Sequence, residues 1–153
     1  MLVQDLMTSP VLTIRAGDAL MDLQDIMKWN HVRHVPVVAA SGEVIGIVSQ
    51  RDLLAAAHST IATGTSPADR RQHLAMSDVE RVMQRNVVTI DPREPVQVAA
   101  AQMRSRRIGC LPVMDGGQLV GIITDADLVR LVEHLSDALL AEVQRPLPRS
   151  SAV

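Results

Sequence analysis

Hydrophobic and polar residues follow one another along this chain in an order that occurs twice. Residues 20–27 and 96–103 carry apolar side chains at the three- and four-residue spacing of a helix. Each stretch is followed by two β-rich runs around a glycine-containing turn, HVPVV and VIGIVS in the first half and CLPVM and LVGIIT in the second. A second helical pattern follows each pair of runs. The order predicts a strand, helix, strand, strand, helix unit in each half.

The two halves align residue by residue. VQDLMTSPVLTI from Val3 matches VERVMQRNVVTI from Val79, at an offset of 76 residues. Beyond the glycine-containing turn the offset falls to 75, and GIVSQRD from Gly46 matches GIITDAD from Gly121. Turns accept such changes in length, so a register that holds on both sides of one indicates a duplicated unit.

Residues typical of helix N-termini mark where the helices are expected to start. Asp18 is the expected N-cap of the first helix, and Pro95 is expected at the first helical position of its counterpart. Ser77 and Glu80 match a capping box, which is expected to restart ordered structure after the connection between the halves.

The duplication sets the expected domain boundaries. The two repeats are predicted at residues 1–60 and 77–136, joined by a linker at 61–76 that has room for a short helix. Residues 137–153 are expected to be the end of a helix and a loose tail. Because one such unit is marginally stable by itself, the two are expected to bury their sheets together. The predicted fold class is α/β (α+β), with two β-α-β-β-α repeats.

Composition narrows the classes of partner. The 153 residues include one Trp, no Phe and no Tyr, and the formal net charge is −2. Single strands of nucleic acid are usually bound by aromatic stacking, and duplexes by a basic excess. The sequence therefore predicts no nucleic-acid ligand.

The expected compartment follows from one cysteine and the lack of targeting segments. Cys110 excludes an intrachain disulfide and fits a reducing compartment. It lies among apolar neighbours, with no His or acid that can be placed beside it, so we expect a small buried side chain rather than a nucleophile. The start MLVQDLMTSP lacks the features of a signal peptide, and no apolar run reaches the roughly 18 residues of a membrane span. We expect a cytoplasmic protein that does not associate with a membrane.

Two further features carry no predicted chemistry. His31 and His34 are three residues apart, but no further ligand stands at a metal-site spacing, so no metal site is predicted. Trp29 ends the first helix and aligns with Ser105, which argues against a core position. It is either an exposed ring at a subunit interface or a cover for the helix end.

A hydroxyl and an acid recur where the second helix of each unit begins. Ser49-x-x-Asp52 and Thr124-x-x-Asp127 match the pattern of a helix cap. The same groups suit a nucleoside, because a helix N-terminus offers amide donors to phosphate and a carboxylate accepts both hydroxyls of a ribose. Capping alone does not require a glycine three residues before each hydroxyl, nor the whole preceding pattern twice. The two interpretations are compatible.

The duplicated pattern M-T-x-x-V-x-T-I … h-P-V … h-G-I-h-[ST]-x-x-D-L resembles a tandem pair of cystathionine-β-synthase (CBS) domains, the arrangement called a Bateman module. The resemblance covers residues 3–134. It implies two repeats packed with pseudo-two-fold symmetry around two clefts. Such clefts bind adenosyl ligands, namely AMP, ADP, ATP or S-adenosylmethionine, as regulatory ligands rather than as required cofactors.

The resemblance also assigns a role to each matching residue. In the first copy it implies Thr13 and Ile14 at the base edge, Val35 and Pro36 in the cleft wall, Ser49 and Asp52 at the ribose, and Arg33, His34 and Arg51 at phosphate. In the second copy the corresponding residues are Thr89, Ile90, Leu111, Pro112, Thr124 and Asp127.

The second copy lacks the basic residues of the first. Gly109, Cys110 and Ala126 replace Arg33, His34 and Arg51, and Asp125 replaces Gln50. Arg106 and Arg107 lie upstream, where they can serve either cleft. The first cleft is therefore expected to bind a phosphorylated ligand before the second, or alone.

Three hypotheses for function follow. The first is a stand-alone regulatory module that binds an adenosyl ligand and signals to an unidentified partner protein. The second is a ligand-free dimerisation or adaptor protein whose motifs only cap helices; Arg33, His34, Arg51 and Asp52 argue against it, because capping does not need that set. The third, an enzyme, lacks a recognisable catalytic constellation, and no enzymatic activity is expected.

A homodimer is expected from the apolar helical faces. Two-fold closure is the commonest way to cover such surface. In the family that the chain resembles, such dimers form a flat disc of four domains. The faces expected at the interface are Leu20/Leu23/Met27 and Leu128/Leu131/Leu135.

Overall fold

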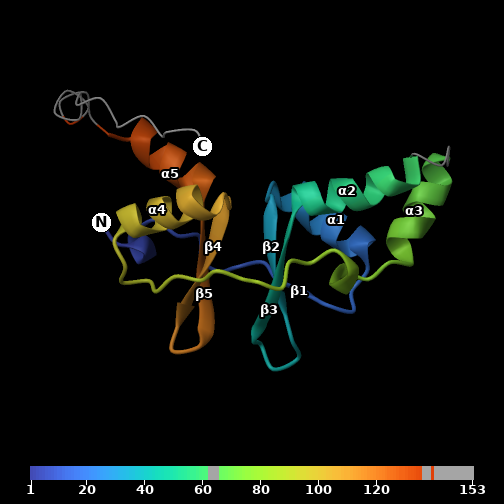
Figure 1. The fold of residues 1–153 in the computed structure, drawn as a ribbon, viewed down its shortest axis with the longest axis horizontal. Helices are drawn as coiled ribbons and strands as arrows, with labels where there is room; N and C mark the ends of the chain where they lie inside the picture. Colours follow the sequence, from blue (N-terminus) through green and yellow to red (C-terminus); the bar gives the residue numbers. More distant parts are fainter. Residues whose placement is uncertain (62–65, 136–138, 140–153) are drawn as a thin grey trace.

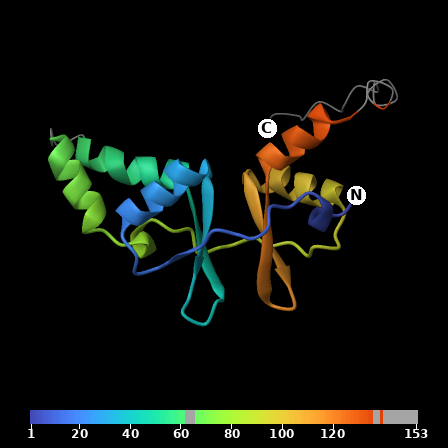
Figure 2. The same cartoon turned by 180° about the vertical axis from the view of Figure 1, so that it is seen from behind.

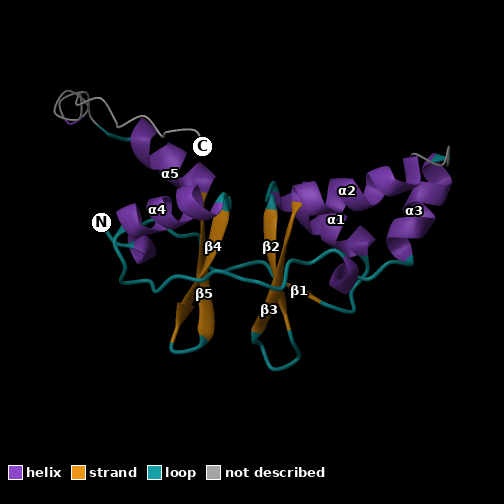
Figure 3. Cartoon of the chain, viewed as in Figure 1, coloured by secondary structure: helices purple, strands orange, loops and turns teal. Residues whose placement is uncertain are grey.

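Two lobes make up the structure, each with a small sheet and helices beside it (Figure 1). The computed structural model describes residues 1–61, 66–135 and 139, with 58–61 described by their backbone alone. Apart from Leu139, the tail predicted at 137–153 lies outside the described residues. The strands of both lobes run through the middle of the molecule, and the helices lie to either side (Figure 3). This mixed α and β architecture in two repeats confirms the predicted fold class.

The elements of the two lobes correspond to the two copies of the sequence pattern. The first lobe contains β1 (Ile14–Arg15), α1 (Leu20–Asn30), β2 (His34–Val38), β3 (Val44–Ser49), α2 (Gln50–Ile61) and α3 (Pro67–Ala75). The second contains α4 (Val96–Arg106), β4 (Cys110–Asp115), β5 (Gln118–Thr124) and α5 (Asp125–Glu133). Two short 3-10 helices, η1 (Val3–Asp5) and η2 (Val79–Arg81), lie at the start of the two repeats.

The sheets differ in their first strand. In the first lobe β1 pairs parallel to β2, and β2 pairs antiparallel to β3, whereas in the described part of the second lobe only β4 and β5 form a ladder. The strand expected before α4 is reduced to one parallel bridge between Ile90 and Val113. That bridge corresponds to the pair Ile14 and Val37 of the first lobe.

The one-residue difference between the copies lies in the hairpin turn, as predicted. Residues 39–43 connect the paired Val38 and Val44, and residues 115–118 connect the paired Met114 and Leu119. The shorter turn has φ of 55° and 84° at Gly116 and Gly117. Two successive positive φ angles suit a tight hairpin and favour glycine at both positions.

Each lobe is completed by a segment from the other copy. The first crossing segment, residues 2–8, forms bridges to the second lobe from Leu2 and Thr8. The second crossing segment, residues 78–84, forms bridges to the first lobe from Asp78 and Gln84. Figure 2 shows the N-terminus beside the second lobe and the chain passing from there to the first. The exchange ties the two lobes together.

The buried side chains form two clusters, one in each lobe. One cluster, in the first lobe, takes in Val79 and Met83 from the second crossing segment. The other, in the second lobe, takes in Val3, whose side chain has no exposed surface. Each cluster is therefore shared between the residues of one repeat and the segment that crosses over from the other copy.

Two predicted helix caps are wrong. Ala19, not Asp18, is the N-cap of α1, and the carboxylate of Asp18 instead accepts a hydrogen bond from the N–H of Arg15 at 2.9 Å. The N–H of Leu20 donates to the carbonyl of Ser77 at 2.8 Å, so the residue just before the second crossing segment satisfies the start of this helix. Pro95 is the N-cap of α4 rather than its first residue.

The capping box predicted at Ser77 and Glu80 is also absent from this part of the described chain. Asp78 is the N-cap of η2 and makes no side-chain cap bond, while Glu80 pairs with Arg85 at 2.7 Å. A capping box that was not predicted lies at Ser66 and Asp69 and starts α3.

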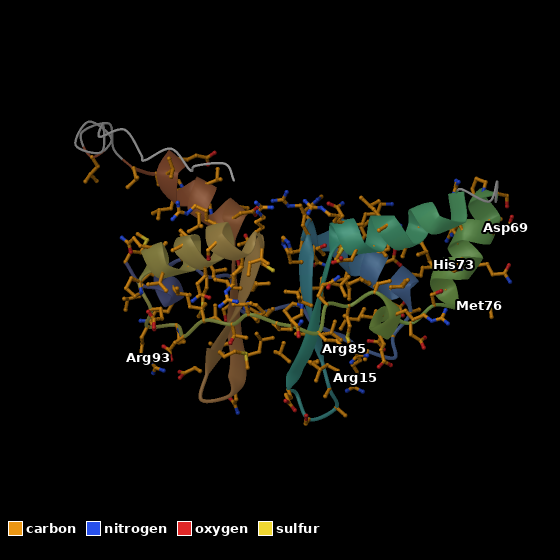
Figure 4. The ribbon with its side chains drawn as sticks, viewed as in Figure 1. Arg15, Asp69, His73, Met76, Arg85 and Arg93 are labelled. Carbon is orange, nitrogen blue, oxygen red and sulfur yellow. The ribbon has the colours of Figure 1, made fainter. Side chains whose placement is uncertain are left out.

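Helix α3 gives the first lobe an extra layer within the predicted linker. It packs against α1 and α2, and Leu74 is buried in the first core. Asp69, His73 and Met76 are exposed, and they project from the outer end of this lobe (Figure 4).

The apolar surface differs from the one expected for a dimer. Leu20, Leu23 and Met27 are buried in the first core, because they are the face by which α1 covers its sheet. Leu128, Leu131 and Leu135 are partly buried. The large apolar side chains exposed on α1, α2 and α5 include Trp29, Leu54, Val129 and Val132.

Candidate ligand-binding cleft

A cleft of about 880 Å³ lies between the lobes. Its walls come from β2, β3 and the start of α2 in the first lobe, and from α4 and β4 in the second. Six of the predicted site residues line it: Arg33, His34, Ser49, Arg51, Asp52 and Pro112. The remaining ones, Thr13, Ile14, Val35, Pro36, Thr89, Ile90, Leu111, Thr124 and Asp127, are described but are not among its lining residues.

The predicted base-edge and wall residues lie mostly in the cores. Ile14 and Val35 belong to the first core, and Ile90 and Leu111 to the second. Pro36 is fully buried, Thr13 is partly exposed and Thr89 is exposed. The side chains in these core positions hold the strands that border the cleft.

Ser49 and Asp52 form the predicted helix cap at the start of α2. The Oδ2 atom of Asp52 accepts from the N–H of Ser49 at 2.8 Å and from its hydroxyl at 2.6 Å. The hydroxyl oxygen accepts from the N–H of Asp52 at 3.2 Å. The second carboxylate oxygen, Oδ1, accepts from Nε2 of Gln84 in the second crossing segment at 3.2 Å. Asp52 is partly exposed and lines the cleft, so a ligand hydroxyl can replace that amide.

Thr124 and Asp127 form the equivalent cap at the start of α5, but the acid is engaged differently. Oδ2 of Asp127 accepts from the N–H and the hydroxyl of Thr124, both at 2.8 Å. Oδ1 pairs with Arg130, and Asp127 is only 4% exposed. Arg130 aligns with Ala55, so the first copy has no counterpart to this partner. The two acids of the duplicated motif are therefore not equally available.

The glycine of the duplicated motif has a packing role. A Cβ atom on Gly46 would lie 2.7 Å from Sδ of Met83 and 3.3 Å from the carbonyl oxygen of Gln84. A Cβ atom on Gly121 would likewise collide with Met7. Each methionine comes from the segment that crosses over from the other copy. Close approach of that segment, which capping does not require, accounts for glycine at both positions.

The acidic residue Asp125 lies in a different cleft from the one expected. Asp125, predicted to weaken the second cleft, lines this one, and its Oδ1 lies 3.2 Å from a guanidinium nitrogen of Arg33. The two strand–helix junctions are built alike: the N–H of Gln50 donates to the carbonyl of Arg33 and the N–H of Asp125 to that of Gly109. The two junctions face each other, so Asp125 of the second repeat pairs with Arg33 of the first.

Two of the lining residues have shifted pKa values. Burial lowers the pKa of His34 below its usual 6.5, with Asp125 acting in the opposite direction, so the imidazole is neutral at pH 7. Burial raises the pKa of the Cys110 thiol to about 12. Cys110 is free and buried, as predicted.

The second lobe supplies further basic and polar residues to the cleft. Arg104 and Arg107, three residues apart at the end of α4, both line it, as do Gln84 and Asn86. Arg107, the C-cap residue of α4, was a candidate for either cleft, whereas Arg104, in the last turn of that helix, was not predicted. Arg106 is not among the described lining residues.

The duplicated lobes and the cleft between them define the class of this protein. The CBS domain family model matches residues 3–59 and 78–134. The chain belongs to the CBS domain family and contains a tandem pair of these domains.

Relatives of similar length support this assignment. A CBS domain-containing protein of Dictyostelium discoideum is 34% identical over 151 residues, which are 98% of each chain. The crystal structure of AcuB from Vibrio cholerae has a TM-score of 0.72 and 34% identity, and it covers 97% of this chain and 98% of its own. The CBS domain pair of protein MJ0100, in complex with 5′-methylthioadenosine and S-adenosyl-L-methionine, has a TM-score of 0.71 and 28% identity over 87% of this chain and 96% of its own.

Several longer relatives are named as enzymes. Homoserine O-acetyltransferase of Methanohalobium evestigatum is 30% identical over 133 residues, which are 86% of this chain and 24% of that protein. The chain thus spans about a quarter of such relatives. Among the described helices, none is long and apolar enough to cross a lipid bilayer.

Proposed function

We propose that this CBS pair is a regulatory module that binds an adenosyl ligand in the cleft between its lobes and conveys the bound state to a partner protein. The observation that carries the proposal is the convergence of the Ser49–Asp52 motif with arginines of both lobes around one cleft. The complex of the MJ0100 pair with two adenosyl compounds supports the ligand class.

The cleft offers a contact for each part of such a ligand. Oδ1 of Asp52 suits the ribose hydroxyls, which would displace the amide of Gln84. Four arginines suit phosphate, because charge-assisted hydrogen bonds are about twice as strong as neutral ones. Apolar side chains suit the faces of the adenine ring, and those in the lining include Ile47, Leu54, Val87, Val88, Met103, Ile108 and Pro112.

The ionisable groups of the cleft favour binding over catalysis. A thiol with a pKa of about 12 is protonated at neutral pH, so Cys110 is a poor nucleophile. The hydroxyl of Ser49 is engaged in both directions by the cap of α2. We therefore propose no enzymatic activity for this site.

A ligand-free adaptor is the second candidate. The exposed apolar side chains of Trp29, Val129 and Val132 favour a protein interface, which both candidates can use. The two differ in whether the cleft is occupied.

A thermal-shift screen tests the proposal. AMP, ADP, ATP, S-adenosylmethionine and NAD are each added to the protein, and a ligand at 100 times its Kd should add about 2.7 kcal/mol to the free energy of unfolding. We expect at least one adenosyl compound to raise Tm. No shift with any of them would favour the adaptor.

A matched pair of variants shows whether the shift comes from the cleft. Asp52→Ala and Asp69→Ala remove the same capping-box acid, since Asp69 accepts from Ser66 as Asp52 does from Ser49. Only Asp52 lines the cleft. Both variants should lose helix-cap stability, because each removes the carboxylate that accepts from the N-cap N–H, but only Asp52→Ala should lose the shift. Equal loss in both would contradict the assignment of Asp52.

A further inference from the structure

The candidate cleft contains more basic than acidic side chains. Its described lining residues include four arginines, Arg33, Arg51, Arg104 and Arg107, and two aspartates, Asp52 and Asp125. The net charge of this set is two positive charges, since His34 is neutral at pH 7. Asp52 is committed to the cap of α2 and to Gln84. Asp125 is the acid that faces the basic side of the cleft.

Asp125 lies where three ionisable groups meet above Gly109. Its Oδ1 is 3.2 Å from the guanidinium of Arg33. A Cβ atom on Gly109 would lie 3.5 Å from Oδ2 of Asp125 and 3.2 Å from two ring atoms of His34. Glycine at this position therefore leaves room for the carboxylate and the imidazole in the lining of the cleft.

The ion pair between Arg33 and Asp125 is weak enough for a ligand to break. Both side chains are more than half exposed, at 58% and 55%. Exposed pairs contribute little to stability because water screens them. An anionic ligand that draws Arg33 into the cleft leaves Asp125 unpaired nearby, where it repels each further negative charge.

On the basis of the proposed function, we propose that Asp125 is a specificity-determining residue that limits the negative charge of the ligand, so that the cleft prefers a nucleoside monophosphate to a triphosphate. A phosphate monoester carries about 1.5 to 2 negative charges at pH 7, which matches the net charge of the lining. A triphosphate carries more charge than the lining can neutralise. The equivalent position in the first repeat is Gln50, which is neutral.

Calorimetry with AMP and ATP, without divalent cations, tests the role of Asp125. The variant Asp125→Gln places at this junction the residue that the first repeat has there, and Asp125→Asn is a second neutral variant if the first folds poorly. Either should improve ATP affinity relative to AMP by about two- to fivefold, the factor that an exposed ion pair typically carries. The gain should shrink as ionic strength rises.

Asp115→Asn is the matched control. Asp115 belongs to the same repeat and pairs with Arg93 at 2.8 Å, but it does not line the cleft. Arg93 lies at the outer edge of the second lobe, away from the middle of the molecule (Figure 4). This variant removes the same charge and should leave the ratio of AMP to ATP affinity unchanged.

The outcomes separate this inference from the proposed function. An unchanged ratio in both Asp125 variants, or the same change in Asp115→Asn, would overturn the role of Asp125 while leaving the binding site in place. Failure of the wild-type protein to bind either nucleotide or any other adenosyl compound would contradict the proposed function, and this inference with it.

Discussion

Asp52 and Asp127 illustrate how equivalent residues acquire different chemistry from their neighbours. Both carboxylates cap a helix through Oδ2, with the same donors from a hydroxyl residue three positions earlier. The two acids differ at the other carboxylate oxygen, Oδ1. In Asp52 it accepts from the neutral amide of Gln84, whereas in Asp127 it pairs with the guanidinium of Arg130. An amide is easily exchanged for a ribose hydroxyl, but a buried carboxylate gives up a guanidinium at greater cost.

The thiol of Cys110 should respond to pH in a defined way. Burial holds its pKa near 12, so at pH 8 the folded protein should react with iodoacetamide far more slowly than the protein in guanidinium chloride. The unfolded thiol ionises near pH 9, so the free energy of unfolding should fall as the pH rises above that value. Mass spectrometry after timed alkylation measures the rates. Equal rates in the folded and unfolded protein would contradict the burial of this residue.

At the scale of the elements, the exchange of the crossing segments determines how both lobes are packed. Each segment bridges to the opposite lobe at its two ends and places a methionine over the glycine of the duplicated motif. The second crossing segment also donates a hydrogen bond from Gln84 to Oδ1 of Asp52 in the cleft. The exchange therefore couples the stability of the lobes to the geometry of the cleft.

Substitution of Gly46 tests this packing. Gly46→Ala should destabilise the protein by about 1–3 kcal/mol, because the added methyl group overpacks the contact with Met83. Gly17→Ala is the control, since no atom lies within 4 Å of a Cβ at that position, and it should be neutral or slightly stabilising. Urea unfolding measures both variants. Similar stability of the two would show that Met83 does not enforce glycine.

The sequence predicted the elements better than their contacts. Periodicity located β2, β3, β4 and α1, and the duplicated motif located both helix caps, because these features depend on residues close together in the chain. The true cap of α1 depends on the carbonyl of Ser77, and the partner of Arg33 is Asp125 from the other repeat. Spacing within one repeat carries no information about such pairs, which only the packing of the two lobes brings together.

At the scale of the whole molecule, the candidate site belongs to neither repeat alone. The first lobe contributes the Ser49–Asp52 cap, and the second contributes Arg104, Arg107 and Asp125. A ligand that contacts both walls would therefore change how strongly the lobes hold each other. That dependence is a physical route by which binding could be passed to a partner protein.

A homodimer is the expected assembly. Trp29 is 74% exposed and Val129 and Val132 are more than half exposed, which leaves apolar surface on helices at both ends of the molecule. Sedimentation at micromolar concentration should give twice the mass of the chain. A double variant, Val129→Glu with Val132→Glu, should weaken the dimer by placing unpaired charges in the contact. A monomer in the wild-type protein would contradict the assembly.

Calorimetry of AMP binding to the wild-type protein, Asp52→Ala and Asp127→Ala is the most direct test of the central claim, which is that the cleft at Ser49 and Asp52 is the ligand site. Asp52→Ala should weaken binding by at least about tenfold, the loss expected for a hydrogen bond to a charged group. Asp127→Ala should have little effect on the affinity, because Asp127 is buried and paired with Arg130 outside the cleft. Loss of binding in Asp127→Ala, with binding kept in Asp52→Ala, would show that the site has been assigned to the wrong cleft.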